Sequence, residues 1–375
     1  MTVIIFLIVL AVLIFVHELG HFVAAKAFGV RVDAFKIGFG PKLIAWRGKS
    51  RHVITTGETE YGINLVPFGG YVKIFGENPD VESITGPDSK RSFVNKKRWQ
   101  QAIVLAAGVL FNFIFAWAIC LWIFVVGGTV PIDAFSSYSD YFSNRQVIVL
   151  DAATSSPAIL AGLGIGDILT SVDSGGTSTP IKIPEDVQRA VNASGGKPIV
   201  VNFIKDGRTN SVTVIPVKGI TKDNYAIGIF MDPIAHVQMP ALTAIKESFT
   251  YAASMIKDTA VGLYSFVIGL FSKPSDFSDV AGPVGIAIIV GNATRLTLGY
   301  LLIVVAIISI NLGVINLIPF PALDGGRILF VLIEGVIRRR ISPKFTNAIN
   351  AVGFILLMIL MLVVTYKDIA KLIIK

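Results

Sequence analysis

Residues 17 to 21 read His-Glu-Leu-Gly-His, which combines two potential metal ligands with a potential base. On a helix, His17 and His21 are about one turn apart and share a face, so both imidazoles can bind one zinc ion. Glu18 is then placed to take a proton from a water molecule at that ion. The pattern follows an apolar run, residues 3–16, and polar groups at membrane depth usually mark function. The sequence therefore predicts hydrolytic zinc chemistry at the end of a membrane-length helix.

A catalytic zinc ion usually has three protein ligands, so one more side chain is needed. His52 lies in a basic stretch and His236 in an expected linker, and we expect both to be surface residues. Asp324 is the better candidate, because it lies where Pro319 and Pro321 interrupt an apolar segment and two glycines follow. A carboxylate in irregular intramembrane backbone needs a partner, and a metal ion is the best one available. We therefore predict Asp324 as the third ligand.

The predicted ligands also have structural interpretations. Asp is favoured at helix N-caps, so Asp324 could cap a helix beginning near Gly326. The two histidines could form a polar contact between packed helices. The combination of the HExxH pattern, its place at the end of an apolar run and a second intramembrane acid favours the metal site.

The composition indicates a polytopic membrane protein. Of 375 residues, 53% are hydrophobic and 15% are charged, and the mean hydropathy is +0.70. Soluble domains carry about 25% charged residues. Most of the net charge of +8 flanks apolar runs, so it indicates topology, and we expect no nucleic-acid partner. The single cysteine, Cys120, excludes a disulfide framework and a cysteine-based metal site.

Four apolar segments approach the length of about 20 residues that a membrane-spanning helix needs. A shorter, glycine-rich stretch at 280–291 is interpreted as re-entrant or as a packed half-helix. Thirteen Lys and Arg in the loop 26–98, and a basic cluster after the third segment, predict that both loops are cytoplasmic. Three lysines at 367, 371 and 375 would then lie outside, against this rule. The four segments are residues 3–25, 102–126, 299–318 and 347–365.

Two regions have strand-like alternation. Residues 144–218 predict a compact α/β module, with a tight hairpin turn at Asp206-Gly207 and a short helix over 184–194. The flanking segments 129–143 and 218–240 are expected to be linkers. Residues 50–75 predict a small sheet between the first two spans. It could be an ordinary cytoplasmic hairpin, or it could dip into the membrane and pair with an extended substrate strand.

These motifs together resemble the site-2 proteases. The resemblance is carried by the HExxH pattern, by residues 316–326 (Asn-Leu-Ile-Pro-Phe-Pro-Ala-Leu-Asp-Gly-Gly) and by residues 67–72 (Pro-Phe-Gly-Gly-Tyr-Val). Residues 155–169 are similar to the PDZ pattern of the bacterial regulated-intramembrane-proteolysis branch, and residues 282–285 also match. One departure is Val109, where the family often has proline after Ala-Gly, whereas Asn112 is retained.

The resemblance implies His17, His21 and Asp324 as zinc ligands and Glu18 as the residue that activates water. It also implies that Asn316 contacts the substrate backbone, although from the residues alone Asn316 could equally hold two helices together. Asn311 has the same ambiguity and is interpreted as structural. Further substrate contacts are expected at Pro319, Pro321, Gly69 and Gly70.

The predicted fold is an α-helical polytopic membrane protein with four transmembrane helices, a membrane-associated β-sheet and an inserted α/β PDZ domain. Residues 238–296 are expected to form amphipathic or re-entrant helices, either lying on the membrane surface or simply packing. The remaining expected divisions are 1–28 (first span), 29–98 (sheet-containing loop), 99–127 (second span), 144–218 (PDZ domain), 297–337 (third span and break) and 345–367 (fourth span).

The predicted function is intramembrane proteolysis, in which a zinc enzyme cuts transmembrane segments of single-span proteins such as an anti-sigma factor or remnant signal peptides. The resemblance implies a bacterial cell-membrane location, with the PDZ domain outside and the active site toward the cytoplasm. It also implies an upstream site-1 protease acting on the same substrate. The PDZ domain is expected to filter substrates, as a sieve or as a peptide receptor. A metal transporter and an inactive membrane scaffold are the alternatives.

Overall fold

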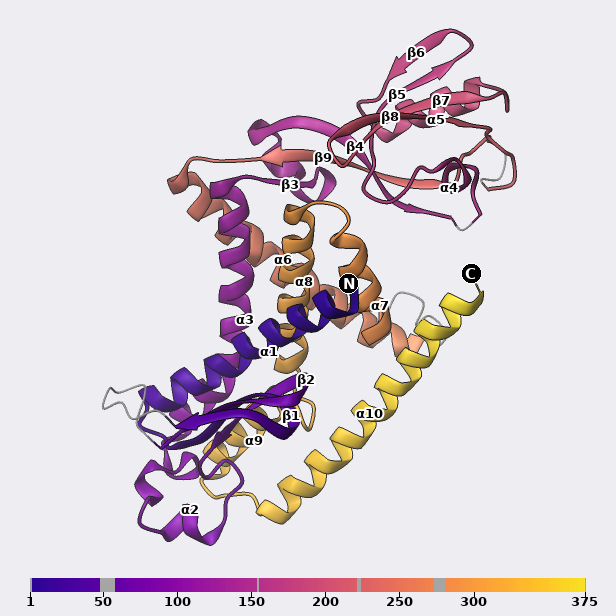
Figure 1. Cartoon of the computed structure of the whole chain (residues 1–375). Coiled ribbons are helices and arrows are strands. Elements are labelled where there is room, and N and C mark those ends of the chain that lie inside the picture. Colours follow the sequence, from indigo (N-terminus) through magenta and orange to yellow (C-terminus); the bar gives the residue numbers. More distant parts are fainter. Residues whose placement is uncertain (1, 48–57, 154, 221–223, 273–280, 375) are drawn as a thin grey trace.

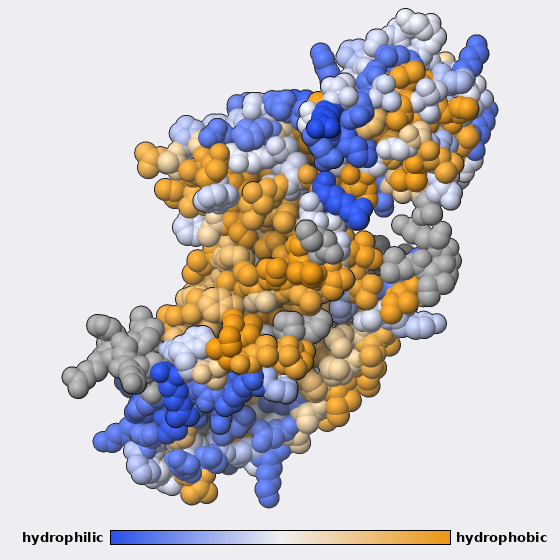
Figure 2. Space-filling view, viewed as in Figure 1, coloured by the Kyte–Doolittle hydropathy of each residue, from blue (hydrophilic) through white to orange (hydrophobic). Residues whose placement is uncertain are grey.

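The computed structural model describes residues 2–47, 58–153, 155–220, 224–272 and 281–374. Within these residues, four helices are long and apolar enough to cross a membrane, which confirms the predicted number. Figure 2 shows an apolar band between two more hydrophilic ends. The four helices are α1 (Thr2–Ala27), α3 (Arg98–Val126), α8 (Leu298–Leu317) and α10 (Pro343–Ile374).

Helices α1, α3 and α8 form one packed group around buried apolar side chains such as Leu13, Ala116 and Ile310. Glycine allows the closest approach between α1 and α3, since a β-carbon on Gly20 would lie 2.3 Å from the carbonyl oxygen of Ala107. Backbones that pack this closely fix the rotation of each helix about its axis. The face of α1 that carries both histidines is thereby turned toward α3.

Helix α10 stands apart from this group in Figure 1. Near its start, Gly353 packs against Pro321. Near its end, the Gly285 N–H donates to Asp368 Oδ2 at 2.8 Å. Gly285 belongs to α7 (Pro283–Ala293), an 11-residue apolar helix that packs on α1 and α8, consistent with the half-helix interpretation.

The sheet between the first two spans is larger than predicted. It consists of β1 (Val32–Arg47) and β2 (Glu60–Ile74), and residues 50–57 lie outside the described part of the chain. Phe35 pairs with both Tyr61 and Val72, so the first half of β1 lies between the two halves of β2. Among the described strands, residues 70–74 therefore pair on one side only and form an edge beside α1. A short helix, α2 (Val81–Thr85), and the 3₁₀ turns η1 (Ser89–Arg91) and η2 (Phe93–Asn95) lead to α3.

The second sheet contains seven strands and lies at the opposite end of the molecule from β1 and β2 (Figure 1). Its strand order is β3-β9-β4-β5-β7-β8, β6 pairs with β5, and all pairs are antiparallel. The hairpin turn at Asp206-Gly207 is confirmed, and both residues have positive φ. The strands are β3 (Gly128–Pro131), β4 (Phe142–Ala152), β5 (Ile168–Ser174), β6 (Thr177–Pro180), β7 (Ile199–Lys205), β8 (Arg208–Val214) and β9 (Ile229–Val237).

The linker prediction for the segments flanking this module was wrong. Residues 129–143 contain most of β3 and the 3₁₀ segment η3 (Asp133–Tyr141), and residues 218–240 contain β9, which lies between β3 and β4. Pro233 and the short apolar runs on either side of it conceal the strand in the sequence. Two helices, α4 (Pro157–Ala161) and α5 (Pro184–Ala193), complete the module around an apolar core.

Two further helices pack against the membrane-length helices. The long helix α6 (Ala241–Ser272) packs its first half on α3 and α8, with Ser248 accepting a hydrogen bond from Trp117 Nε1 at 3.1 Å. That half is therefore a packing helix, although Leu242 and Phe249 remain exposed. Helix α9 (Asp324–Ile337) follows the break after α8 and brings the third predicted ligand back toward α1.

Candidate metal centre

The three predicted ligands converge although α1 and α9 are about three hundred residues apart in the chain. His17 Nε2 lies 3.1 Å from Asp324 Oδ2, His21 Nε2 lies 3.3 Å from the same oxygen, and the two Nε2 atoms are 3.3 Å apart. Ligand atoms held about 2.0–2.1 Å from a tetrahedral zinc ion are about 3.3–3.4 Å apart. The spacing of these three side chains therefore fits a zinc ion.

The structural alternative for Asp324 is not supported. The N-cap of α9 is Leu323, and Asp324 is the first residue of the helix rather than its cap. Its Oδ2 atom is buried without a hydrogen-bond donor, and it is the atom that faces both imidazoles. A buried carboxylate oxygen in this position needs a cation, and a bound metal ion satisfies it.

The break between α8 and α9 brings Asp324 next to the two histidines because its backbone folds back very tightly. A β-carbon on Gly325 would lie 2.3 Å from the carbonyl oxygens of Leu317 and Ile318, and one on Gly326 would lie 2.2 Å from that of Phe320. No larger residue fits at either position without moving the backbone. The Asp-Gly-Gly sequence is thus required by packing as well as by chemistry.

Helix α3 supports both histidines from behind. The Nδ1 atom of His21 lies 2.9 Å from the carbonyl oxygen of Val104, so Nδ1–H donates to it and Nε2 keeps a free lone pair. Metal-binding histidines are usually oriented by such a bond. A β-carbon on Gly108 would lie 2.4 Å from His21 Nε2, so this glycine makes room for the imidazole.

Asn112 orients the other histidine, and the sequence prediction did not include it in the site. Its side-chain amide lies 3.1 Å from His17 Nδ1, and its Oδ1 is buried without a donor. Metal binding through Nε2 requires a hydrogen on Nδ1, which needs an acceptor. With the Asn112 amide turned so that Oδ1 faces the ring, Nδ1–H donates to it, and the orphaned oxygen gains its partner.

Glu18 lies on the cavity side of the ligands. Its Oε2 atom accepts a hydrogen bond of 3.0 Å from the backbone N–H of Val72, so this N–H points away from β1. A cavity of about 250 Å³ adjoins these groups. It has room for several water molecules and carries polar groups able to hold them. Its lining residues are His17, Glu18, His21, Tyr71, Val72, Ile74, Glu77, Leu105, Asp324 and Arg327.

The other predicted site residues lie at varied distances from this centre. Asn316 Nδ2 is 3.5 Å from His17 Nε2, so Asn316 lies beside the ligands. Gly70 lies over Ile14 of α1, and Gly69 packs against the Phe39 ring; neither lines the cavity. Pro319 lies in the break, and Pro321 contacts α10.

Of the remaining histidines, His52 is outside the described residues. His236 lies on β9 against Gly127, away from the metal ligands. The position of His236 agrees with its exclusion from the chemistry, whereas the exclusion of His52 stays a prediction. Among the described residues, His17, His21 and Asp324 are the one group of three side chains able to hold a metal ion.

The sequence profile of Peptidase family M50 matches residues 5–360. The chain belongs to peptidase family M50. Its site-2 protease character is thereby confirmed, and it is a metalloprotease with zinc as its metal.

Several relatives are similar to this chain over nearly their whole length, and all three described here are named zinc metalloproteases. The protein from Clostridium perfringens is 34% identical over 97% of both chains. That from Nostoc is 33% identical over 97% of this chain and 94% of its own. That from Clostridium acetobutylicum is 32% identical over 96% of this chain and 94% of its own.

Proposed function

We propose that this M50 metalloprotease cuts transmembrane segments of single-span membrane proteins, with His17, His21 and Asp324 as zinc ligands. The observation that carries the proposal is that two ligands lie on α1, one of the four membrane-length helices. Peptide bonds within a bilayer are the substrates that such a centre can reach. The bilayer and transmembrane protein substrates are its partners in this proposal.

A helical substrate must lose its helical hydrogen bonds before a peptide carbonyl can be attacked, because these bonds satisfy every backbone group in the membrane. The edge strand 70–74 supports this step. It runs beside α1, its outer edge is unpaired among the described strands, and Val72 points its N–H toward Glu18. Extended substrate backbone can add to this edge, as in other strand-addition complexes.

The reacting groups then have defined roles. A zinc ion held by the three ligands would supply a Lewis acid for the carbonyl and lower the pKa of water. Glu18 takes the proton of the attacking water and delivers it to the leaving amine. Asn316, beside His17, is positioned to donate a hydrogen bond from its amide to the substrate backbone.

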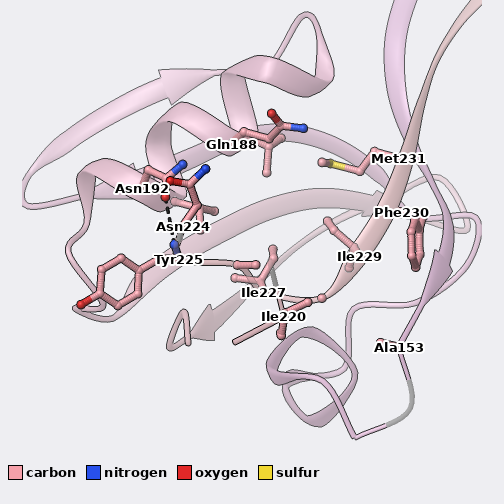
Figure 3. A pocket seen from close by; sticks show the side chains of 14 residues that line it. Ala153, Gln188, Asn192, Ile220, Asn224, Tyr225, Ile227, Ile229, Phe230 and Met231 are labelled. Atoms are coloured by element: carbon pink, nitrogen blue, oxygen red, sulfur yellow. Dashed lines mark hydrogen bonds between the residues drawn. The ribbon is translucent and has the colours of Figure 1, made fainter. Parts of the chain in front are cut away.

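The outer α/β module is proposed to be a PDZ domain that filters substrates. A groove of about 340 Å³ lies between α5 and residues 225–231, as Figure 3 shows. Its lining contains no charged side chain and includes Val191, Ile227 and Met231. An uncharged groove between a helix and a strand suits capture of an apolar peptide end, so it favours a receptor over a sieve.

The receptor and sieve interpretations can be separated with one variant. Phe230 lines the groove and is 65% exposed, so Phe230→Asp can be made without disturbing a core. A receptor predicts weaker binding of apolar C-terminal peptides and slower cleavage of trimmed substrates. A sieve predicts unchanged cleavage of trimmed substrates, with exclusion only of those that keep large outer domains.

The proposed orientation places the outer module on the extracytoplasmic side of a bacterial cell membrane and the metal centre toward the cytoplasm, following the positive charge of residues 26–98. An upstream site-1 protease would trim the outer part of the substrate first. An anti-sigma factor or a remnant signal peptide fits this class of substrate. A transporter or inactive scaffold would have no use for Glu18 beside the ligands.

The direct test is Glu18→Gln in the purified full-length protein. Zinc content and thermal stability should stay near wild type, while cleavage of a single-span substrate should fall by a factor of about 10²–10⁴. Substantial remaining cleavage would exclude Glu18 as the base. Asp324→Asn should lower zinc content by elemental analysis, and unchanged zinc would remove Asp324 from the ligand set.

A further inference from the structure

The cavity at the metal centre is bounded by an ion pair that does not belong to the ligand set. Arg327 Nη1 and Glu77 Oε1 are in direct contact, and both residues line the cavity. Their side chains are 28% and 19% exposed, so water screens the pair only partly. We propose that Arg327 and Glu77 position the edge strand over the metal centre and thereby select which substrate bond is cut. This inference rests on the proposed function.

Arg327 is tied to the third ligand by helix geometry. It lies three residues after Asp324 in α9, and residues at this spacing share one face of a helix. Both side chains accordingly line the same cavity. A contact that holds the Arg327 side chain therefore also restrains the first turn of α9, which carries the Asp324 carboxylate.

Glu77 is tied to the edge strand by a rigid turn. Its N–H donates to the carbonyl of Ile74, the last residue of β2, at 3.2 Å. Gly76 between them has a φ of +73° and lies so close to Ser92 that a β-carbon would collide with its Oγ at 1.9 Å. The backbone of Glu77 therefore has a fixed place relative to Val72, whose N–H donates to Glu18.

The ion pair joins two parts of the site that come from different elements of the chain. One part is the edge strand 70–74, whose Val72 is hydrogen-bonded to Glu18, and the other part is α9 with Asp324. Among the ion pairs of the described residues, Arg327–Glu77 is the one that joins β2 and its turn to α9. A substrate strand that pairs with residues 70–74 in one register therefore has a fixed position relative to the metal centre.

The pair also separates two cavities. Glu77, Leu105 and Arg327 line both the 250 Å³ cavity at the ligands and a smaller one of about 90 Å³ toward Arg98 and Glu334. Loss of the pair would merge these spaces and free the strand end. Reacting groups misplaced by about 1 Å can lose about 10²-fold in rate.

The test compares Arg327→Met with a matched control in the full-length enzyme. Arg98–Glu334 is a second ion pair to α9 with similar exposure, 30% and 15%, and neither residue lines the cavity at the ligands. Arg327→Met should keep its zinc and a KM within about threefold, while kcat falls by a factor of about 10–100 and cleavage spreads to neighbouring bonds, read by product mass. Arg98→Met should cut the wild-type bond at near the wild-type rate.

Exchanging the charges of Glu77 and Arg327 provides a rescue experiment. Glu77→Arg combined with Arg327→Glu should recover most of kcat and the single cleaved bond, whereas each single change should not. The inference is overturned if Arg327→Met cuts the same single bond within twofold of the wild-type kcat, if it loses zinc, or if Arg98→Met shows the same defect. A wild-type enzyme that holds zinc but cuts no single-span substrate would instead overturn the proposed function.

Discussion

The imidazole of His21 packs directly on the backbone of Gly108, so closely that a β-carbon there would lie 2.4 Å from Nε2. The same β-carbon would lie 2.8 Å from Cε1 of His17. One glycine of α3 thus leaves the space in which both ligand rings stand. The consequence is that α3, which provides none of the three proposed ligands, defines where the metal can be.

Gly108→Ala is expected to remove zinc binding, because the added methyl group would lie 2.4 Å from His21 Nε2 and would push the imidazole out of its place. Elemental analysis of the purified protein measures this. Gly335→Ala is the matched control, since Gly335 lies in α9 and has no atom within 4 Å of its β-carbon position. Full zinc occupancy in Gly108→Ala would show that the rings can stand elsewhere.

Asn112→Leu is expected to lower zinc affinity by about 10- to 100-fold, because His17 Nδ1–H loses its acceptor. Asn112→Asp keeps an acceptor oxygen and should retain most of the affinity. Competition with a chelator of known affinity measures both variants. Equal zinc affinities of Asn112→Leu and wild type would mean that the Asn112 amide does not orient the His17 ring.

Asp368→Ala is expected to destabilise the attachment of α10 by about 1–3 kcal/mol, because the Gly285 N–H is left without its acceptor at a partly buried site. The thermal unfolding temperature in detergent should fall. Asp258→Ala on α6 is the control, since Asp258 is exposed. An unchanged unfolding temperature for Asp368→Ala would show that the bond contributes little to holding α10.

Glu60 is expected to make the β1–β2 sheet sensitive to acid. Hydrogen bonds from Lys36 and then Lys42 lower the pKa of Glu60 from 4.5 to about 2. A lowered pKa contributes stability that is fully present above pH 4.5 and is lost as the pH falls through about 2. The difference in unfolding temperature between wild type and Glu60→Gln should therefore shrink over this range. A difference that stays constant with pH would contradict this role.

Much of the site was predictable because its signals are local. The four-residue spacing of His17 and His21, and the Pro-rich break before Asp324, can each be read from one short segment. Asn112 and Gly108 were not predicted as part of the site because their contacts reach across more than eighty residues. A polar Asn within the apolar run 102–126 was the available signal for Asn112.

The sheets were predicted less completely. Phe35, Ile37 and Phe39 alternate with Lys36 and Gly38, a strand pattern that the sequence prediction left out although it begins the observed β1. The pairing of Phe35 with both halves of β2 depends on the tertiary fold and could not be read from the alternation. Strand β9 was assigned to a linker. Pro233 lies within it, yet the strand tolerates this residue between β3 and β4.

The order of the ligands along the chain has a consequence for the cell. Translation at about 5–20 residues per second separates the synthesis of Glu18 from that of Asp324 by about 15–60 s. Throughout this interval the nascent chain has the proposed base and both imidazoles but lacks the third proposed ligand. The proposed metal centre therefore cannot be complete, and the proposed proteolysis cannot begin, before residue 324 has been made.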